Sequence, residues 1–303
     1  MTSTSLRPQA LPSVPAPLVS VIVPHFDDLA RLDTCLTALR AQIYEGAFEI
    51  VVGDNGSPQG EAAVAAVVAG RARLVVEARK GAGPARNTAV AAAKGALLAF
   101  TDCDCVPEPE WLASGVAALQ RADIAGGYLY VFPENPKAVT SVEAFDIVFG
   151  FDNEHYVRKT GYSVTASLFC SRKVFDRVGG FRVGVSEDME WGHRALSAGC
   201  TMTYEGRARV AHPARRTWDE LLKKWRRLDS EMYGLVRPGA APRIAWILRS
   251  MAFPASTLLH TPKVLTTPLL HGMPQRVKAL FTLARIRFWR CGDCLRLAFL
   301  PSG

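Results

Sequence analysis

The sequence lacks a long apolar run without charges. Its longest candidate is the thirteen residues between Arg249 and Lys263, which two prolines and a histidine interrupt. A membrane-spanning helix needs about 20 apolar residues, so we expect no ordinary spanning helix. Residues 1–17 hold Ser, Pro and one Arg but no apolar core of a secretory signal, and we expect a flexible leader there.

The sequence also lacks a compact disulfide framework. Its seven cysteines are odd in number and scattered along the chain. Cys291 and Cys294 have a CxxC spacing, but no second pair stands nearby, so a structural role explains them better than a zinc or redox site. This cysteine usage favours a reduced, cytoplasmic compartment.

Most of the chain lacks a charge excess. The 303 residues include 36 basic and 28 acidic ones, which gives a net charge of +8. Residues 241–303 contain nine of the basic residues and one acid, so residues 1–240 hold 27 of each sign. A nucleic-acid-binding protein would carry its excess through the folded body, and we expect no nucleic-acid partner.

Residues 241–303 instead mix apolar and basic side chains. Between Val277 and Arg290 this pattern predicts a basic amphipathic helix, and we expect a helical segment over 241–303. Such helices bind anionic membrane surfaces, which would place the protein on the inner face of the cell membrane. Packing of the apolar residues on the rest of the chain is the alternative, and the sequence favours neither.

Apolar strands alternate with helices over the first 120 residues or so. The predicted strands are 18–23, 48–53, 73–77 and 96–101, and the helices are 29–43, 62–69 and 83–93. This alternation predicts parallel βαβ units in an open α/β sheet. Farther along the chain, we predict strands at 123–130 and 163–170, short strands near 202 and 209, and helices at 139–160, 187–198 and 217–233. The Pro/Gly-rich residues 234–242 indicate a boundary.

A polar or glycine-containing loop follows each of the first four strands. Ligands of such sheets bind beyond the carboxyl ends of the strands, so the four loops predict one composite site. Its candidate residues are Pro24, His25, Phe26, Asp54, Asn55, Lys80, Gly83, Arg86, Asn87, Asp102, Cys103 and Asp104.

Asp102 and Asp104 are the candidate metal ligands. Residues two apart in an extended chain point the same way, so both carboxylates would face one side, with Cys103 and Cys105 facing the other. Carboxylate oxygens suit Mg²⁺ or Mn²⁺, although a simple turn explains the same residues. His212, at the end of an apolar strand, could complete the coordination or be structural.

The remaining polar candidates each have two interpretations. Asp54 forms a turn or accepts a hydrogen bond from a nucleobase. Arg86 and Lys80 stand beside glycines at a helix start, where they contact phosphate or are solvated charges. Glu187 and Asp188 offset the dipole of their helix, or one of them is a general base that deprotonates a hydroxyl.

In this order, the motifs resemble those of the family 2 glycosyltransferases, which are inverting enzymes with the GT-A fold. The resemblance covers roughly residues 18–215, and each motif falls where the strand pattern puts it. The matching segments are Val19–Pro24, Glu49–Ser57, Gly83–Asn87, Phe100–Asp104, Val178–Phe181 and Glu187-Asp188. The sequence departs from the family at His25–Asp27, where an aromatic residue and Asn are usual, and at Thr165–Ser167, where many members have an Asn.

The resemblance implies roles for these residues. Asp102 contacts the nucleotide sugar and Asp104 the metal. Asp188, or its neighbour Glu187, is the base. The residues expected around the nucleobase and the diphosphate are Pro24, Asp54 and His212. The implied glycosyltransferase domain spans 18–235, with a nucleotide-sugar half at 18–122 and an acceptor half at 123–235.

The implied function is non-processive transfer of a sugar from a nucleotide donor to a hydroxyl. We expect a UDP-sugar, a divalent cation (Mn²⁺ or Mg²⁺), and an acceptor that is a cell-envelope or exopolysaccharide glycan or a lipid-linked intermediate. Processive members carry Gln-x-x-Arg-Trp, which residues 223–227 do not match. Alternatives from other classes are a non-catalytic nucleotide-sugar-binding or membrane scaffold protein, and a nucleotidyltransferase.

Overall fold

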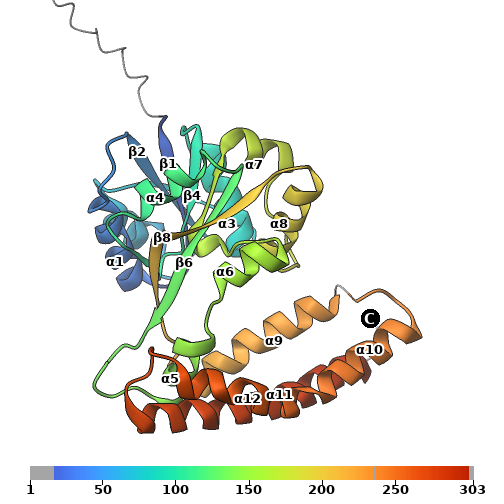
Figure 1. Ribbon diagram of the computed structural model, residues 1–303. Helices are drawn as coiled ribbons and strands as arrows, with labels where there is room; N and C mark the ends of the chain where they lie inside the picture. The colour runs from blue at the N-terminus through green and yellow to red at the C-terminus, as the bar shows by residue number, and fades with distance from the viewer. Residues whose placement is uncertain (1–16, 235, 300–303) are drawn as a thin grey trace, which may run out of the picture.

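The computed structural model describes residues 17–234 and 236–299. Residues 1–16 of the expected leader, and 300–303 at the end of the expected helical tail, lie outside the described residues. The described chain forms a mixed eight-stranded sheet with helices on both faces, and a further layer of helices lies beneath the sheet (Figure 1).

The sheet has the strand order β3-β2-β1-β4-β7-β6-β8-β5. Its first four strands are parallel, as the alternation of strands and helices predicts. β7 is antiparallel to both β4 and β6, β6 and β8 are parallel, and β5 is an antiparallel edge strand. The predicted open, mostly parallel sheet flanked by helices is therefore confirmed. The strands are β1 (Val19–His25), β2 (Phe48–Asp54), β3 (Arg73–Val76), β4 (Leu97–Phe100), β5 (Val106–Pro107), β6 (Ile124–Phe132), β7 (Leu168–Ser171) and β8 (Met202–Pro213).

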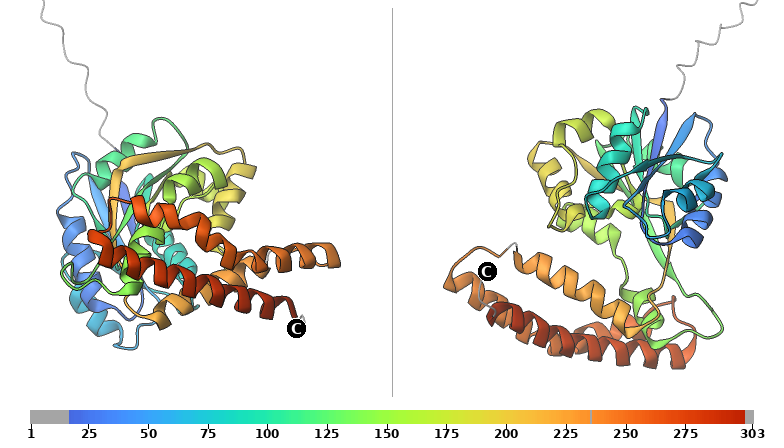
Figure 2. Two further views of the ribbon diagram at one scale, coloured as in Figure 1. Left: turned by 60° about the horizontal axis from the view of Figure 1, so that its bottom comes forward. Right: turned by 180° about the vertical axis from the view of Figure 1, so that it is seen from behind.

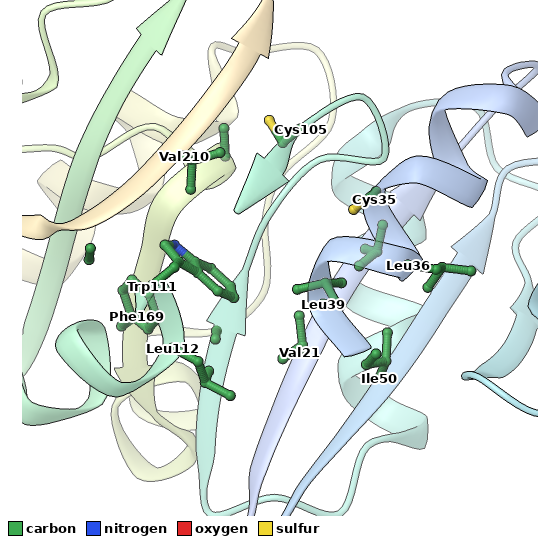
Figure 3. Packing of buried hydrophobic residues seen from close by; sticks show 14 of the residues in the cluster. Val21, Cys35, Leu36, Leu39, Ile50, Cys105, Trp111, Leu112, Phe169 and Val210 are labelled. Atoms are coloured by element: carbon green, nitrogen blue, oxygen red, sulfur yellow. The ribbon is translucent and has the colours of Figure 1, made fainter. Parts of the chain in front are cut away.

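Successive residues of β1 belong to different cores because side chains of a strand alternate between its two faces. Val21 lies in a buried cluster with residues of α1 (Leu29–Arg40), α2 (Glu61–Val68) and α4 (Trp111–Ala118). Ile22 lies in a second cluster with residues of α3 (Ala82–Ala92), α7 (Arg172–Val178) and α8 (Glu187–Ser197). In the first cluster the Trp111 ring packs on Phe169, with ring centres 4.9 Å apart (Figure 3).

The helix predicted over 139–160 is divided. It consists of α5 (Ser141–Phe149), α6 (Asn153–His155) and a π-helical turn (Tyr156–Thr160). The break has a local cause, because the Asp152 side chain accepts a hydrogen bond from the His155 N–H and so caps a new helix. This break places Phe151 and the end of α5 beside the candidate site described below.

Two strand predictions also differ from the structure. The strands predicted near 202 and 209 are one strand, β8, whose register with β6 shifts between Gly127 and Tyr128. The strand predicted at 163–170 starts only at Leu168, after a 3₁₀ turn at Thr165–Ser167. The unpredicted elements α4, α7 and β5 are short and lack a clear apolar period.

The chain after the sheet forms the helices α9 (Trp218–Gly234), α10 (Ala240–Met251), α11 (Phe253–Thr266) and α12 (Gly272–Phe299). With α5 they make the helical layer seen beneath the sheet in Figures 1 and 2. Thr282 Oγ1 donates to Ser141 O at 2.8 Å, and the buried Arg290 pairs with Asp229 at 2.6 Å. Among the described helices, none combines the length and apolar character needed to cross a membrane.

Candidate active site

The loops after β1, β2 and β4 meet at one edge of the sheet around a cavity of about 260 Å³. Eight of the predicted site residues line it, and α3 contributes one of them. These residues are Pro24, His25, Phe26, Asn55, Arg86, Asp102, Cys103 and Asp104. Phe26 is exposed at the rim, whereas Pro24 and His25 are buried. The composite site expected from separate loops is thus one physical cavity.

The loop after β4 is a turn, because the Cys105 N–H donates to Asp102 O at 3.1 Å. The extended geometry predicted for this loop is therefore wrong, and Cys105 faces the same side as the aspartates. One oxygen from Asp102, one from Asp104 and the Cys105 sulfur all lie within 4.8 Å of one another. Burial raises the pKa of the Cys105 thiol, which stays neutral, so the two carboxylates are the anionic donors of this group.

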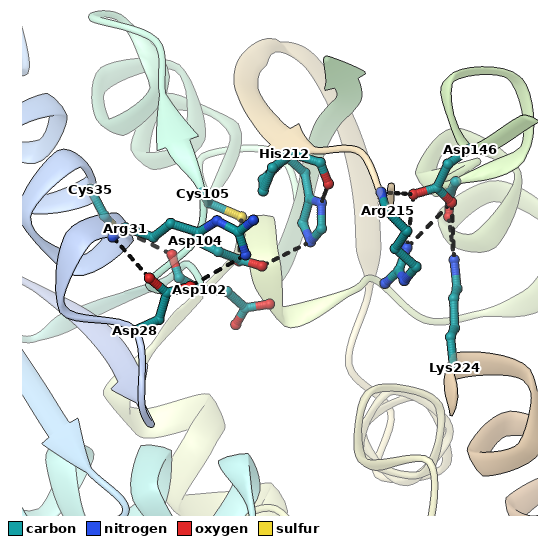
Figure 4. A network of polar contacts seen from close by, with 12 residues as sticks. Asp28, Arg31, Cys35, Asp102, Asp104, Cys105, Asp146, His212, Arg215 and Lys224 are labelled. Carbon is teal, nitrogen blue, oxygen red and sulfur yellow. Dashed lines mark hydrogen bonds and ion pairs between the residues drawn. The ribbon is translucent and has the colours of Figure 1, made fainter. Parts of the chain in front are cut away.

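His212, at the end of β8, reaches the same turn. Its Nε2 lies 3.4 Å from Asp104 Oδ2. Figure 4 marks this contact with a dashed line. The His212 Nδ1 lies 2.7 Å from Pro213 O and donates to it, because a carbonyl only accepts. Nε2 is then the ring nitrogen that faces Asp104, and two carboxylates and an imidazole nitrogen form a donor set that fits Mn²⁺ or Mg²⁺.

Arg86 joins two acidic segments of the site. Its guanidinium is buried and contacts Asp102 Oδ1 at 2.5 Å and the Glu187 carboxylate on its other side. Burial alone would lower the pKa of Arg86, but Asp102 and Glu187 outweigh it and hold that pKa above its ordinary value. Gly83 admits Glu187, since a Cβ there would lie 2.6 Å from Glu187 Oε2. The Arg86 guanidinium is thus paired with two carboxylates in this structure.

Asp188 forms no ion pair with a residue in the described ranges. Its Oδ1 accepts from the Thr165 N–H at 3.2 Å. Burial raises the pKa of Asp188 to about 6, with Arg86 acting in the opposite direction and Glu187 adding to the rise. Glu187 and Asp188 therefore differ in their chemistry. The Glu187 carboxylate is paired with a guanidinium, whereas the pKa of Asp188 lies close to neutral pH.

Four of the twelve loop residues predicted for the composite site do not line the cavity. Asp54 is buried and accepts from His25 Nδ1 at 2.9 Å and Ser57 Oγ at 2.5 Å, so it orients His25. Despite burial, these hydrogen bonds hold the pKa of Asp54 below its ordinary value. Asn87 bonds the backbone of Phe181, donating to its oxygen at 2.8 Å and accepting from its N–H at 2.9 Å. Lys80 is exposed, and Gly83 contacts Glu187.

Asp146 is a buried acid beside the site that the sequence analysis did not single out. It is fully buried on α5 and accepts from the Arg215 backbone N–H and from Arg215 Nη1, each at 3.0 Å. Beside it, the Phe151 and His212 rings lie 4.9 Å apart. The available signal was an acid within the apolar run 144–149, where a buried carboxylate needs partners.

A family model, "Glycosyl transferase family 2", matches residues 20–188 of this chain, which is more than half of it. The chain belongs to glycosyl transferase family 2. This family 2 glycosyltransferase is 29% identical to "Glycosyltransferase AglE" of Haloferax volcanii over 91% of this chain and 92% of that protein. It is 26% identical to a validoxylamine A glucosyltransferase of Streptomyces hygroscopicus subsp. jinggangensis over 76% of this chain and 63% of that protein.

Solved structures agree on the fold. The mannosyltransferase PcManGT of Pyrobaculum calidifontis, in complex with GDP-Man and Mn²⁺, superposes on this glycosyltransferase with a TM-score of 0.63, covering 95% of this chain and 88% of that one. GalNAc-T7 with UDP, GalNAc and Mn²⁺ gives a TM-score of 0.52 over 66% of this chain and 44% of that one. At 18% and 17% identity these likenesses show the GT-A fold alone. The expected family and fold are both confirmed.

Proposed function

We propose that this glycosyltransferase moves a sugar from a nucleoside diphosphate donor to a hydroxyl with inversion at the anomeric carbon. The nucleoside binds in the cavity formed by Pro24, His25, Phe26 and Asn55, next to the aspartate turn. UDP is the expected nucleotide, and GDP is the first competitor to test because PcManGT holds GDP-Man. We propose non-processive transfer because residues 223–227 do not match the Gln-x-x-Arg-Trp of processive members.

Asp104, Asp102 and His212 would hold the divalent cation. A bound Mn²⁺ or Mg²⁺ supplies positive charge that stabilises the departing diphosphate. One Asp102 oxygen is taken by Arg86, which leaves its other oxygen and the Asp104 carboxylate facing the cavity. Arg86 fixes Asp102 in this orientation.

Asp188 is the proposed base, and its environment is the observation that carries the proposal. A base must be unprotonated yet hold a proton well enough to take one, which requires a pKa near the working pH. Asp188 meets this requirement with a pKa of about 6, whereas Glu187 is paired with Arg86. The acceptor oxygen attacks the anomeric carbon, the bond to the diphosphate breaks, and the hydroxyl proton passes to Asp188.

The test is the Asp188→Asn variant in an assay of nucleoside diphosphate release across UDP- and GDP-sugars, with and without acceptor glycans. We expect a loss of at least about 100-fold in transfer, the usual contribution of a general base, with nucleotide binding unchanged. Wild-type turnover in this variant would refute the assignment. No release with any donor would favour the non-catalytic scaffold, and release of inorganic pyrophosphate would favour a nucleotidyltransferase.

We also propose that the enzyme works on the inner face of the cell membrane. Along α12, Met273, Val277, Phe281 and Phe288 share one helix side and are each at least 57% exposed. The side that carries Ala279, Leu283 and Ile286 is buried against α5 and α9. Packing and membrane contact, the two alternatives for this segment, thus involve different sides of one helix. An envelope glycan or lipid-linked acceptor fits this placement.

A further inference from the structure

A second cavity, of about 450 Å³, adjoins the nucleotide cavity and shares Asp104 with it. It lies between the His212–Arg215 segment and α9, whose residues 220, 223, 224 and 227 line it. Those positions are three or four apart and form one face of the helix. The other face of α9 packs Leu221 and Trp225 into the helical layer. We call this space the cationic cleft.

The cationic cleft contains more positive than negative side chains. Its cations are Arg31, Arg215, Lys223, Lys224 and Arg227, and its acids are Asp104 and Glu220. Glu220 is already engaged, because its carboxylate accepts from the Arg216 and Thr217 N–H groups at 2.8 and 3.2 Å. Lys223 forms no ion pair with any residue in the described ranges.

In the wall of the cleft, two cations share one buried carboxylate. Asp146 serves both Arg215, at 3.0 Å, and Lys224, at 3.8 Å, so one carboxylate faces two cations (Figure 4). The Lys224 side chain is only 13% exposed, and its Nζ otherwise donates to Gly150 O at 3.3 Å. Uncompensated buried charge is costly, and burial accordingly lowers the pKa of Lys224 to about 8. An anion in the cleft would supply the missing negative charge.

We propose that the cationic cleft binds a phosphate or diphosphate group carried by the acceptor. The inference rests on the proposed function, which places the donor nucleotide in the neighbouring cavity. The two cavities have only Asp104 in common, so a nucleoside bound among Pro24, His25 and Asn55 leaves the α9 side of the cleft unfilled. A phosphate held there would present the acceptor beside the donor, and a lipid-linked acceptor would reach it from the helical layer.

The experiment titrates inorganic phosphate into the protein saturated with Mg²⁺ and UDP or GDP, and follows both ligands by calorimetry. We expect one phosphate to bind per chain without displacing the nucleotide. The Lys223→Ala/Arg227→Ala double variant should weaken phosphate binding at least tenfold and leave nucleotide binding unchanged. Both side chains are exposed, so the fold should persist.

Two controls make the result specific. Arg226→Ala removes a charge from the same helix outside the cleft, where the guanidinium lies 5.4 Å from the Trp289 ring, and should bind phosphate like the wild type. Lys223→Arg/Arg227→Lys keeps the charge and should restore binding. Absence of phosphate binding, equal weakening in the Arg226→Ala variant, or displacement of the nucleotide would each overturn the proposal. Failure to bind nucleotide at all would instead count against the proposed function.

Discussion

Glu187 and Asp188 are chain neighbours in opposite electrostatic surroundings. Arg86, which is 101 residues from Glu187 in sequence, pairs with Glu187, while the Asp188 carboxylate accepts from a backbone N–H and has a pKa raised by burial. From the sequence, either acid could be the base. The distinction depends on a tertiary contact with α3, which no local pattern encodes.

Transfer should depend on the ionisation of Asp188. Burial raises the pKa of Asp188 to about 6, and the base works only when deprotonated. We expect kcat/KM to be constant above about pH 7 and to fall about tenfold per pH unit below about pH 6. A pH profile with a small acceptor measures this. A profile that stays flat to pH 5 would exclude Asp188 as the base.

Arg86 supplies a second test of the same ionisation. Its charge lowers the pKa of Asp188 and so opposes the effect of burial. In an Arg86→Gln variant that still turns over, the acidic limb of the profile should therefore move to higher pH. A limb that stays in place would mean that another group controls it.

Because burial disfavours the ionised carboxylate, ionised Asp188 should lower the free energy of unfolding. Its pKa is raised from 3.8 to about 6 on folding, so folding favours the protonated form and stability falls as the pH rises through that window. At pH 7, Asp188→Asn should increase the free energy of unfolding by on the order of 1–3 kcal/mol, at about 1.4 kcal/mol per pKa unit. Urea unfolding at pH 7 and pH 4 measures it, and the gain should shrink at pH 4. An equal gain at both pH values would point to packing instead of charge.

At the scale of elements, local pattern predicts residues 18–122 well. The runs that form β1, β2 and β4 are apolar enough to be buried on both faces, and their polar ends meet at one sheet edge as parallel topology requires. Strands β6 and β8 and the break after α5 were harder to predict because they depend on a register shift and on the Asp152 cap. Asp146 was missed for the same reason, since its partners lie on other elements.

The exposed side of α12 should carry membrane binding. Phe281 and Phe288 are 61% and 65% exposed, so Phe281→Asp/Phe288→Asp should leave the thermal unfolding temperature near that of the wild type. Binding to phosphatidylglycerol vesicles, measured by co-sedimentation, should fall at least about tenfold because apolar insertion is lost. Ile43 is an equally exposed apolar residue outside residues 241–303. The Ile43→Asp variant should therefore bind the vesicles like the wild type. Undiminished sedimentation of the double variant would exclude this surface.

At the scale of the whole molecule, the charge pattern and the packing describe the tail differently. By charge, residues 241–303 stand apart, with nine basic residues and one acid attached to a neutral body. By packing, they are continuous with that body, because Val264, Leu283 and Ile286 share a buried cluster with Phe145 and Leu221. The sequence predicts the amphipathic helix but not which of its sides is covered, since α5 supplies the partner from far along the chain.

This continuity makes a prediction for a chain truncated after Pro238. Removing α10–α12 uncovers the apolar sides of α5 and α9 and removes Arg290, the buried partner of Asp229. We expect the truncated chain to unfold at a clearly lower temperature and to bind a hydrophobic dye, as measured by calorimetry and fluorescence. Its loss of vesicle binding would then reflect unfolding as well as a missing surface. A truncated monomer that unfolds cooperatively at the wild-type temperature would instead establish residues 241–303 as an independent segment.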